Sequence, residues 1–538
     1  MNLKKYKFFS CKSINLLYNI IPILIFTGTV KPQSQFQSII GGTNSDVAWS
    51  ITLSADGGYV TSGITSSFGS GFNDIYLIKF DANGAVQWTK TIGGIKNDGG
   101  NSIIRTTDNG YAVAGTTLSY GAGNYDFFIV KLDVNGAVQW SRTIGGAYLE
   151  TALSITQTTD GGYAVTGFTL SFGSPPGYYD MYVVKLDSGG SLQWSSSIGS
   201  TGNDLAYSIV QSSDGGYAVA GSYLKQFCIV KLNSDGTLQW SKIMDGIGYC
   251  ISLIRTADNG YAMTGYKYGI STTDADMCIV KLDSNGTVQW SRTIGGAYND
   301  QGACIIQTTD GGYAVSGLTD SLGTGLYDVY LVKLDSNGTV QWSKTTGGNS
   351  AEYGWTIVQT TDGGYAVAGE TLSFGESNDV YFVKLDAFGN TCVNSTSRTA
   401  VLGTTNAFRS ITPTVTAQNS NVTSPAPIIS SGGNLTSVCL TGKQNISNEI
   451  PSSFSLSQNY PNPFNPKTII NYQLPMSNFV KLIIYDVMGK EIVTLVNEQL
   501  KSGTYEVEWN ASEFPSGVYF YRLQTESFKE TKRMILIK

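Results

Sequence analysis

The sequence predicts an all-β protein: a seven-bladed β-propeller of four-stranded blades, followed by a small Ig-like β-sandwich. The first observation is a tight-turn motif, Asp-(Gly/Asn)-Gly-Tyr, which recurs seven times in the 538 residues. The aspartates of this motif are Asp56, Asp108, Asp160, Asp214, Asp258, Asp310 and Asp362. The second observation is their spacing of 52, 52, 54, 44, 52 and 52 residues, which is typical of one structural unit copied in tandem. The third is a run of short alternating strand patterns near the C-terminus.

Each copy contains four strand patterns. In the second copy they cover residues 101–107, 111–116, 126–132 and 137–144. Tight turns join the first strand to the second and the third to the fourth, whereas a loop of variable length joins the second to the third. Four antiparallel strands per unit make one propeller blade.

The ring must also close on itself. The seventh copy lacks its fourth strand, and residues 36–42 resemble that strand and the Gly-Gly pair after it. We therefore expect the N-terminal segment to complete the last blade. The Trp of strand four and the Tyr of the turn motif recur in nearly every copy, which favours packing between blades. The Lys of strand three is expected to form hydrogen bonds or ion pairs from blade to blade.

Composition excludes several classes of function. The chain has no histidine and a net charge of -6. The missing histidine removes the Ser-His and Cys-His nucleophile pairs, so we predict that the protein is not an enzyme. The acidic charge disfavours nucleic-acid binding.

The N-terminus predicts export. Basic residues precede a short apolar stretch at residues 14–26, and we interpret residues 1–34 as a signal peptide. No transmembrane helix is expected in the mature chain. The predicted location is therefore secreted or on the outer-membrane surface, reached through the periplasm.

Residues 35–393 form the predicted propeller, residues 394–453 a Ser/Thr/Asn/Pro-rich linker, and residues 454–538 a C-terminal module. Cys228, Cys250, Cys278 and Cys304 lie on predicted strands, where buried thiols are expected. Cys392 and Cys439 flank most of the linker and are candidates for a disulfide in an exported protein.

Two sets of acids lie on the face of the propeller that carries the variable loops and the blade crossings. The first acidic set lies ten residues before each turn Asp: Asp46, Asp98, Glu150, Asp204, Asp300 and Glu352. The second acidic set lies five residues before each strand-three Lys: Asp74, Asp126, Asp180, Asp276, Asp328 and Asp379. The first set is interrupted in blade five by Gly248, and the second in blade four by Gln226.

Two interpretations of these acids remain open. A ring of carboxylates could hold a cation such as Ca²⁺ or an amine. Repeated acids at loop entrances could instead accept backbone hydrogen bonds and fix the loops. No dedicated metal site is predicted, and calcium stays a candidate ligand only. Acids from the two sets, such as Asp98 and Asp126, would be the pair that an enzyme uses.

The C-terminal module carries a distinctive set of motifs. They include the run from Asn459 to Pro466, Ile484-Tyr485-Asp486 with Gly489, and residues 516–523. The candidate sorting residues are Asn459, Tyr460, Pro461, Asn462, Pro463, Phe464, Asn465, Pro466, Gly489, Gly517 and Tyr519. With these motifs, residues 454–538 resemble the type A C-terminal sorting domain of the type IX secretion system of Bacteroidetes-like bacteria. The resemblance implies passage through the outer membrane by that machinery.

These observations predict an exported cell-surface or secreted propeller protein with a binding or structural role. Its partners would be the type IX machinery and an extracellular ligand, either a glycan or a protein. Two alternatives stay open: an extracellular glycan-acting enzyme that uses paired carboxylates, and a metal-dependent adhesin.

Overall fold

The computed structural model describes residues 35–391, apart from 174–175, 270–273, 324 and 376. It also describes short strands between residues 396 and 447, and residues 451–537 apart from 512–513. The predicted signal peptide and Cys392 lie outside these described residues. Every regular element within them is a β-strand, and none of them forms a helix long and apolar enough to cross a membrane. The chain divides into two compact units, Ser38–Thr436 and Ser437–Lys538.

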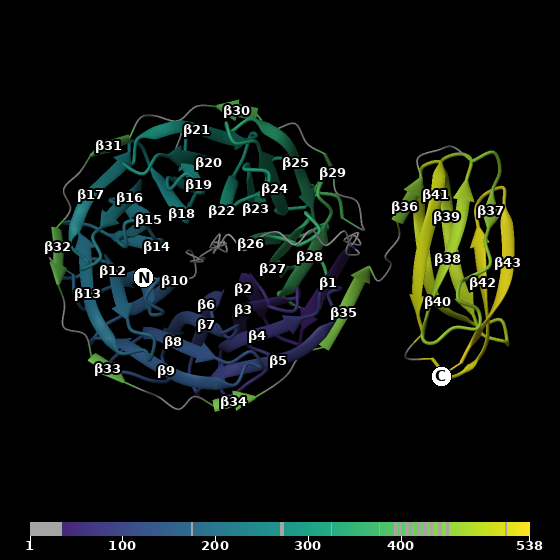
Figure 1. Cartoon of the computed structure of the whole chain (residues 1–538), viewed down its shortest axis with the longest axis horizontal. Helices are drawn as coiled ribbons and strands as arrows, with labels where there is room; N and C mark the ends of the chain where they lie inside the picture. Colours follow the sequence, from purple (N-terminus) through teal and green to yellow (C-terminus); the bar gives the residue numbers. More distant parts are fainter. Residues whose placement is uncertain are drawn as a thin grey trace, which may run out of the picture. The chain divides into compact units, whose positions relative to one another are not determined.

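The first unit is a ring of seven antiparallel sheets, which confirms the predicted propeller (Figure 1). Blades 1 to 3 contain β2 (Asp46–Leu53), β3 (Tyr59–Thr65), β4 (Asp74–Phe80), β5 (Val86–Gly93); β6 (Asp98–Arg105), β7 (Tyr111–Thr117), β8 (Asp126–Leu132), β9 (Val138–Gly145); and β10 (Glu150–Gln157), β11 (Tyr163–Thr169), β12 (Asp180–Leu186), β13 (Leu192–Gly199). Blades 4 and 5 contain β14 (Asp204–Gln211), β15 (Tyr217–Tyr223), β16 (Gln226–Leu232), β17 (Leu238–Met244); and β18 (Gly248–Arg255), β19 (Tyr261–Tyr268), β20 (Ala275–Leu282), β21 (Val288–Gly295). Blades 6 and 7 contain β22 (Asp300–Gln307), β23 (Tyr313–Thr319), β24 (Asp328–Leu334), β25 (Val340–Thr346); and β26 (Glu352–Gln359), β27 (Tyr365–Thr371), β28 (Asp379–Leu385).

The N-terminal strand closes the ring as expected. Strand β1 (Phe36–Gly41) pairs with β28 and supplies the fourth strand of blade 7. Its side chains Phe36, Ile39 and Ile40 are buried. Closure therefore rests on apolar packing as well as on the hydrogen bonds of the strand.

Aromatic rings connect neighbouring blades, as the repeated pattern predicts. Each strand-four Trp packs edge-on against the Tyr of the turn motif in the next blade, for example Trp140 against Tyr163 with ring centroids 5.6 Å apart. The other pairs are Trp88–Tyr111, Trp194–Tyr217, Trp240–Tyr261, Trp290–Tyr313 and Trp342–Tyr365. This repeated contact buries a large apolar surface at six of the seven junctions.

The strand-three lysines act within a blade, not between blades, and this corrects the sequence-based expectation. Lys131 Nζ lies 2.8 Å from Asp108 Oδ2, and Asp108 belongs to the first turn of the same blade. The other pairs are Lys79–Asp56, Lys185–Asp160, Lys231–Asp214, Lys281–Asp258, Lys333–Asp310 and Lys384–Asp362. Burial alone would raise the pKa of Asp160, but hydrogen bonds from Lys185 and Thr158 outweigh it and hold the pKa at about 2.

A belt of short strands surrounds the ring, drawn as green arrows along its rim in Figure 1. The belt consists of β29 (Thr396–Ser397), β30 (Val401–Gly403), β31 (Phe408–Ser410), β32 (Thr414–Ala417), β33 (Asn421–Thr423), β34 (Ile428–Ser430) and β35 (Asn434–Cys439). These strands pair, in chain order, with the outer strands of blades 6, 5, 4, 3, 2, 1 and 7. The chain thus runs backwards around the whole propeller.

The belt adds a fifth strand to each of the expected four-stranded blades, and its strands lie within residues 394–453, where the sequence predicted a linker. Each blade has five strands once its belt strand is included. The outer strand of a blade has an open edge whose N–H and C=O groups need partners. The belt pairs with these edges through two to four residues at a time, as at Ser196–Ala417 to Gly199–Thr414 in blade 3.

The second unit contains two four-stranded sheets. The first has the order β36 (Gln444–Ser447), β41 (Gly503–Asn510), β38 (Lys467–Leu474), β37 (Ser455–Leu456). The second has the order β40 (Glu491–Leu500), β39 (Asn478–Tyr485), β42 (Gly517–Gln524), β43 (Lys529–Leu536). Side chains of both sheets, including Tyr472, Val507, Leu482 and Tyr521, share one apolar core. The unit therefore has a core of its own, as a two-sheet sandwich requires.

Candidate functional site

The strand order gives the propeller two different faces. The tight turns between strands one and two and between strands three and four lie on one face, which we call the turn face. The loops between strands two and three lie on the opposite face with the crossings between blades, and we call it the loop face. Both acidic sets lie at strand ends on the loop face.

The first acidic set begins the innermost strand of six blades, and its side chains are at most 2% exposed. Glu150 shows the arrangement. Its Oε2 accepts a hydrogen bond from the backbone N–H of Gly146 at 2.7 Å. Its Oε1 accepts hydrogen bonds from the Thr169 hydroxyl and the Ser171 N–H. The carboxylate therefore ties the blade crossing to the loop between strands two and three.

The second acidic set lies at the start of strand three. Asp126 Oδ2 accepts a hydrogen bond from the N–H of Ala122 at 2.7 Å, which fixes the preceding loop. Its Oδ1 is buried and has no hydrogen-bond partner in the protein. A methyl group added at Gly145 would lie 1.7 Å from that oxygen and 2.7 Å from Oε2 of Glu150. The two carboxyl groups therefore crowd the same glycine.

The acids pair across blade junctions, with strand three of one blade facing the innermost strand of the next. Glycines lie between both members at five junctions: Asp379–Asp46, Asp74–Asp98, Asp126–Glu150, Asp276–Asp300 and Asp328–Glu352. The sixth pair by position is Asp180 and Asp204. The suggested pairing of Asp98 with Asp126 within one blade is not what the structure shows, because each of them faces an acid of a different blade.

Burial and mutual repulsion favour one proton per pair. Burial raises the pKa of Asp126 to about 7, and the charge of Glu150 adds to the effect. Burial likewise raises the pKa of Asp74 to about 6, with a contribution from Asp98. A proton on Asp126 would turn its unpartnered oxygen into a donor toward Glu150. Such a hydrogen bond would link the two blades at the junction.

The seventh junction supports this pairing. It joins blades 4 and 5, where Gln226 and Gly248 occupy the two acidic positions. Both carboxyl groups are therefore missing at the same junction. The backbone bond across it remains, since Gly248 N–H donates to Lys225 O at 2.9 Å, as Asp98 N–H donates to Asn73 O at 2.7 Å elsewhere.

The described residues contain no group of three or more Asp, Glu, Cys or His side chains that could hold a metal ion together. The thiols of Cys228, Cys250 and Cys278 are free and buried, as expected for core residues. Cys304 is also buried, but it is disulfide-bonded and is not the free thiol that the sequence predicted. Burial raises the pKa of the Cys278 thiol to about 12, so this thiol stays protonated. Cys392 lies outside the described residues, so the predicted disulfide with Cys439 stays a prediction.

Exposed apolar side chains gather on the loop face, which the sequence analysis missed. Nine of the eleven exposed large apolar side chains of the described propeller lie there: Phe72, Ile95, Tyr148, Tyr178, Leu224, Ile247, Tyr298, Leu326 and Leu372. Only Val134 and Phe388 lie on the turn face. The sequence shows that these residues occupy loops in which the repeats differ from one another, but it does not show which of the side chains are exposed.

The sorting motif of the second unit is built into its core. Phe464 is 2% exposed and packs against Trp509, and its backbone pairs with Ile535 and Ile537 of the C-terminal strand region. Asn459 donates its side-chain N–H groups to Pro461 O and Thr468 Oγ1. Tyr460, by contrast, is 79% exposed. The motif therefore attaches the start of the domain to its last strand.

Three other sorting residues lie in a turn, in the core packing and at a strand end. Gly489 has a φ of +79° in the turn after β39, a conformation that favours glycine. Tyr519 packs edge-on against Trp509 and donates its hydroxyl proton to Pro515 O. Gly517 begins β42. These three positions support the fold of the module.

Residues 458–538 match the family described as the secretion system C-terminal sorting domain. This module is a sorting domain. The match confirms the resemblance to the type IX sorting domain drawn from the motifs, and it means that the protein is exported to the cell surface or secreted. The sorting domain also implies contact with the type IX machinery.

Similarity over the propeller is weaker. The regulatory protein FlaEY of Caulobacter vibrioides is 26% identical over 220 residues, which are 35% of this chain and 23% of that protein. A protein of unknown function from Dyadobacter fermentans is 12% identical with a TM-score of 0.34, over 66% of this chain and 96% of that one. PorZ, a surface component of the type IX system of Porphyromonas gingivalis, is 10% identical with a TM-score of 0.28, over 93% of this chain and 75% of that one.

Proposed function

We propose that this exported protein is a cell-surface binding protein whose propeller binds its ligand with the loop face. The observation that carries the proposal is the gathering of nine exposed large apolar side chains on that face. A partner that binds this face would bury apolar surface that is otherwise exposed to water, which favours binding. The sorting domain supplies the route to the surface.

The composition of the loop face favours a protein ligand. Phe72, Tyr148, Tyr178 and Tyr298 are aromatic, whereas the other five exposed side chains are aliphatic. Aromatic side chains are enriched in protein interfaces, and aliphatic ones add apolar contact area. Sugar binding depends more on aromatic platforms with nearby polar groups. A glycan ligand is the alternative.

The acidic pairs support a role without catalysis. They are buried at the blade junctions, and backbone N–H groups occupy many of their oxygens. A glycosidase needs two carboxyl groups that reach the substrate from an open cleft. We therefore propose that the acids hold the ring together. Turnover of common polysaccharides that disappears in an Asp126→Asn variant would contradict this.

Site-specific photocrosslinking tests the binding face. A benzoylphenylalanine at position 148 on the loop face is compared, in cells that export the full chain, with one at position 388 on the turn face. Both native side chains are aromatic and strongly exposed, at 65% and 71%. We expect a discrete protein adduct from position 148, and the same adduct from the equivalent position 298. Equal adducts from both faces, or none from the loop face, would refute the proposal.

Glycan arrays and calcium titration address the alternatives. Glycan binding that is lost in Tyr148→Ala, without protein adducts, would support the glycan ligand. Ligand binding that depends on added Ca²⁺ would support the metal-dependent adhesin.

A further inference from the structure

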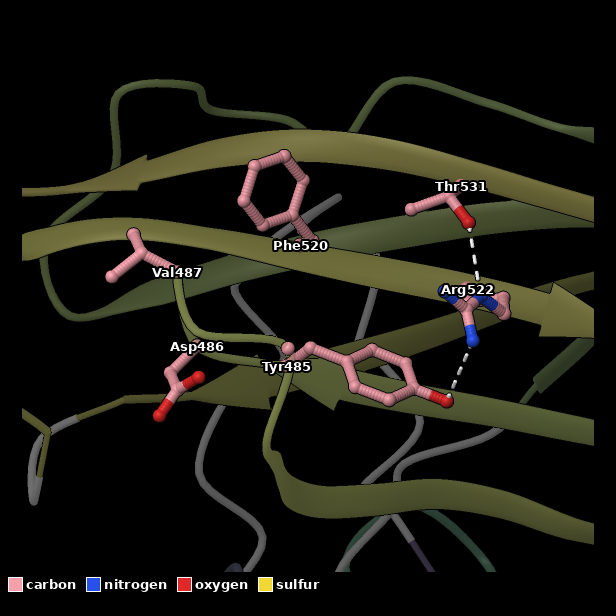
Figure 2. A pocket seen from close by; sticks show the side chains of 7 residues that line it. Tyr485, Asp486, Val487, Phe520, Arg522 and Thr531 are labelled. Atoms are coloured by element: carbon pink, nitrogen blue, oxygen red, sulfur yellow. Dashed lines mark hydrogen bonds between the residues drawn. The ribbon is translucent and has the colours of Figure 1, made fainter.

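The sorting domain has a small cavity of about 210 Å³ at the end of its second sheet (Figure 2). Its lining includes Tyr485, Phe520, Arg522 and Thr531, from the three neighbouring strands β39, β42 and β43. Asp486, Val487 and Gly489 of the turn after β39 complete the lining.

Arg522 is held in a fixed position in this cavity. Its guanidinium carbon lies 4.6 Å from the centroid of the Tyr485 ring. Its Nε donates to Thr531 Oγ1 at 3.1 Å, and its Nη1 donates to Tyr485 Oη at 3.3 Å, as the dashed lines in Figure 2 show. The remaining nitrogen, Nη2, takes part in neither bond. A positioned guanidinium of this kind binds carboxylates well.

The surrounding sheet face is basic. Strand register places Arg522 between Ile483 and Thr531 on this face. It places Phe520 between Tyr485 and Arg533 on the same face. The alternate side chains Leu482, Tyr521 and Met534 point into the core. Four cations share the outer face: Lys481, Arg522, Lys529 and Arg533. Two described acids lie beside these cations: Glu491, whose Oε1 accepts a hydrogen bond from the Tyr485 hydroxyl at 3.4 Å, and Asp486 in the cavity lining. We call this surface the basic sheet face.

An apolar tip lies beside the basic sheet face. Val487 and Met488 are 65% and 87% exposed, although a tight turn holds them. In that turn, Asp486 Oδ1 accepts hydrogen bonds from the N–H groups of Met488 and Lys490. The turn therefore presents two apolar side chains on a rigid support, which lowers the entropic cost of binding.

We propose that the basic sheet face, together with the Val487–Met488 tip, is the docking surface through which the export machinery recognises this sorting domain. The occupant is a protein surface that carries carboxylates opposite the four cations and an apolar depression for the tip. Charge complementarity steers the encounter, and burial of the tip slows dissociation. The sorting residues Asn459 and Phe464 stabilise the domain through their buried contacts with Thr468 and Trp509.

Charge reversal in the full chain tests the proposal in a host with type IX secretion. The test variant carries Lys481→Glu and Arg533→Glu, both at exposed positions on the basic sheet face. The matched control carries Lys467→Glu and Lys501→Glu, which are exposed, lie outside that face and change the net charge equally. The fraction of protein at the cell surface is measured by its accessibility to added protease.

We expect about five-fold less surface protein for the test variant and wild-type export for the control, because the reversed charges repel the acidic partner. Circular dichroism of purified full-length protein checks that the domain is folded. If the reversals unfold it, the neutral pair Lys481→Gln and Arg533→Gln is used, with a smaller loss expected. Met488→Ser should also reduce export. Wild-type export of folded basic-face variants, or equal losses in the control, would overturn the proposal.

Discussion

Asp126 of blade 2 and Glu150 of blade 3 face one another across a blade junction, with Gly145 between them. Each carboxyl group has one oxygen fixed by a backbone N–H, from Ala122 and Gly146 respectively. The contact couples the loop of one blade to the crossing into the next. Because like charges cannot both be buried so close together, the junction depends on a proton.

This proton makes the stability of the ring depend on pH. The pKa of Asp126 is raised from 3.8 to about 7 in the folded state, so the folded state holds the proton more tightly than the unfolded state. Its contribution to stability is therefore full below pH 4 and falls as the pH rises toward 7. We expect the melting temperature to decrease over this range.

The substitution Asp126→Asn should remove the share of this dependence that comes from the Asp126–Glu150 pair, because an amide stays neutral and can still donate a hydrogen bond to Glu150. At pH 8 the variant should be more stable than the wild type, by about 1 kcal/mol. Thermal unfolding from pH 4.5 to 8 measures both effects. A control substitution at the junction of blades 4 and 5, Gln226→Asn, should leave the pH dependence unchanged. If the melting temperature of Asp126→Asn depended on pH as that of the wild type does, a proton on Asp126 at this junction would be ruled out.

Glycine at the junction should be irreplaceable. A methyl group at Gly145 would overlap both carboxyl groups, so Gly145→Ala should destabilise the ring by about 1–3 kcal/mol. The control is Gly161→Ala on the turn face, where a methyl group would meet only Ser188 at 3.9 Å. Its φ of +80° still costs about 1 kcal/mol, so urea unfolding should give a smaller loss for the control. Equal losses would contradict the crowding argument.

The two members of the ion pair inside each blade should not be equivalent. The Lys131 side chain is 5% exposed, whereas that of Asp108 is 53% exposed. Removing Asp108 leaves a buried ammonium group without its charged partner, but removing Lys131 leaves a carboxylate that water can solvate. We expect Asp108→Ala to destabilise the propeller more than Lys131→Met does. Chemical denaturation measures the free energy of unfolding of the two variants. A larger loss for Lys131→Met than for Asp108→Ala would be inconsistent with this reasoning.

Truncation should reveal the role of the belt. A chain that ends at residue 447 keeps all seven belt strands, whereas one that ends at residue 395 exposes the outer edges of all seven blades. Open edges invite strand pairing between molecules. We expect the longer form to be monomeric and the shorter form to associate and melt earlier. Size-exclusion chromatography and thermal unfolding compare them, and identical behaviour would show that the belt is dispensable.

Deleting β1 tests ring closure. Removal of residues 35–42 takes the fourth strand from blade 7 and exposes Val380 and Phe382 of β28. We expect a large drop in melting temperature, because several buried apolar side chains lose their partners at about 2–5 kcal/mol each. Ile95→Ala, at a position that is 71% exposed, should change stability by under about 0.5 kcal/mol and serves as the control. An unchanged melting temperature on deletion would exclude closure by β1.

The sequence predicted the features that repeat. The seven blades, closure by residues 36–42 and the Trp–Tyr contacts follow from one pattern copied many times. The belt was missed because its strands are only two to six residues long and lie in a polar segment. A weak signal exists, since the strands begin at residues 396, 401, 408, 414, 421, 428 and 434. Consecutive belt strands therefore begin five to seven residues apart, and each of them pairs with the outer strand of one blade.

The pairing of the acids could also have been found. The two interruptions, Gln226 and Gly248, lie in different blades but at adjacent strand ends once the ring is assembled. Because both acids are missing at the same junction, the two acidic positions are expected to contact each other at the other junctions. The exposed apolar side chains of the loop face could not be predicted, because exposure depends on how each loop folds over its neighbours.

The belt also determines how the propeller responds to a pulling force on its C-terminal side. The chain enters through β1 and leaves through β35, which are neighbouring strands of blade 7. In a chain without a Cys392–Cys439 disulfide, tension would detach β35 first and then the belt strands of blades 1, 2, 3, 4, 5 and 6 in turn. Each detachment breaks only a few hydrogen bonds and releases a few residues of chain. The protein would therefore lengthen in small steps under load while its seven blades remain folded.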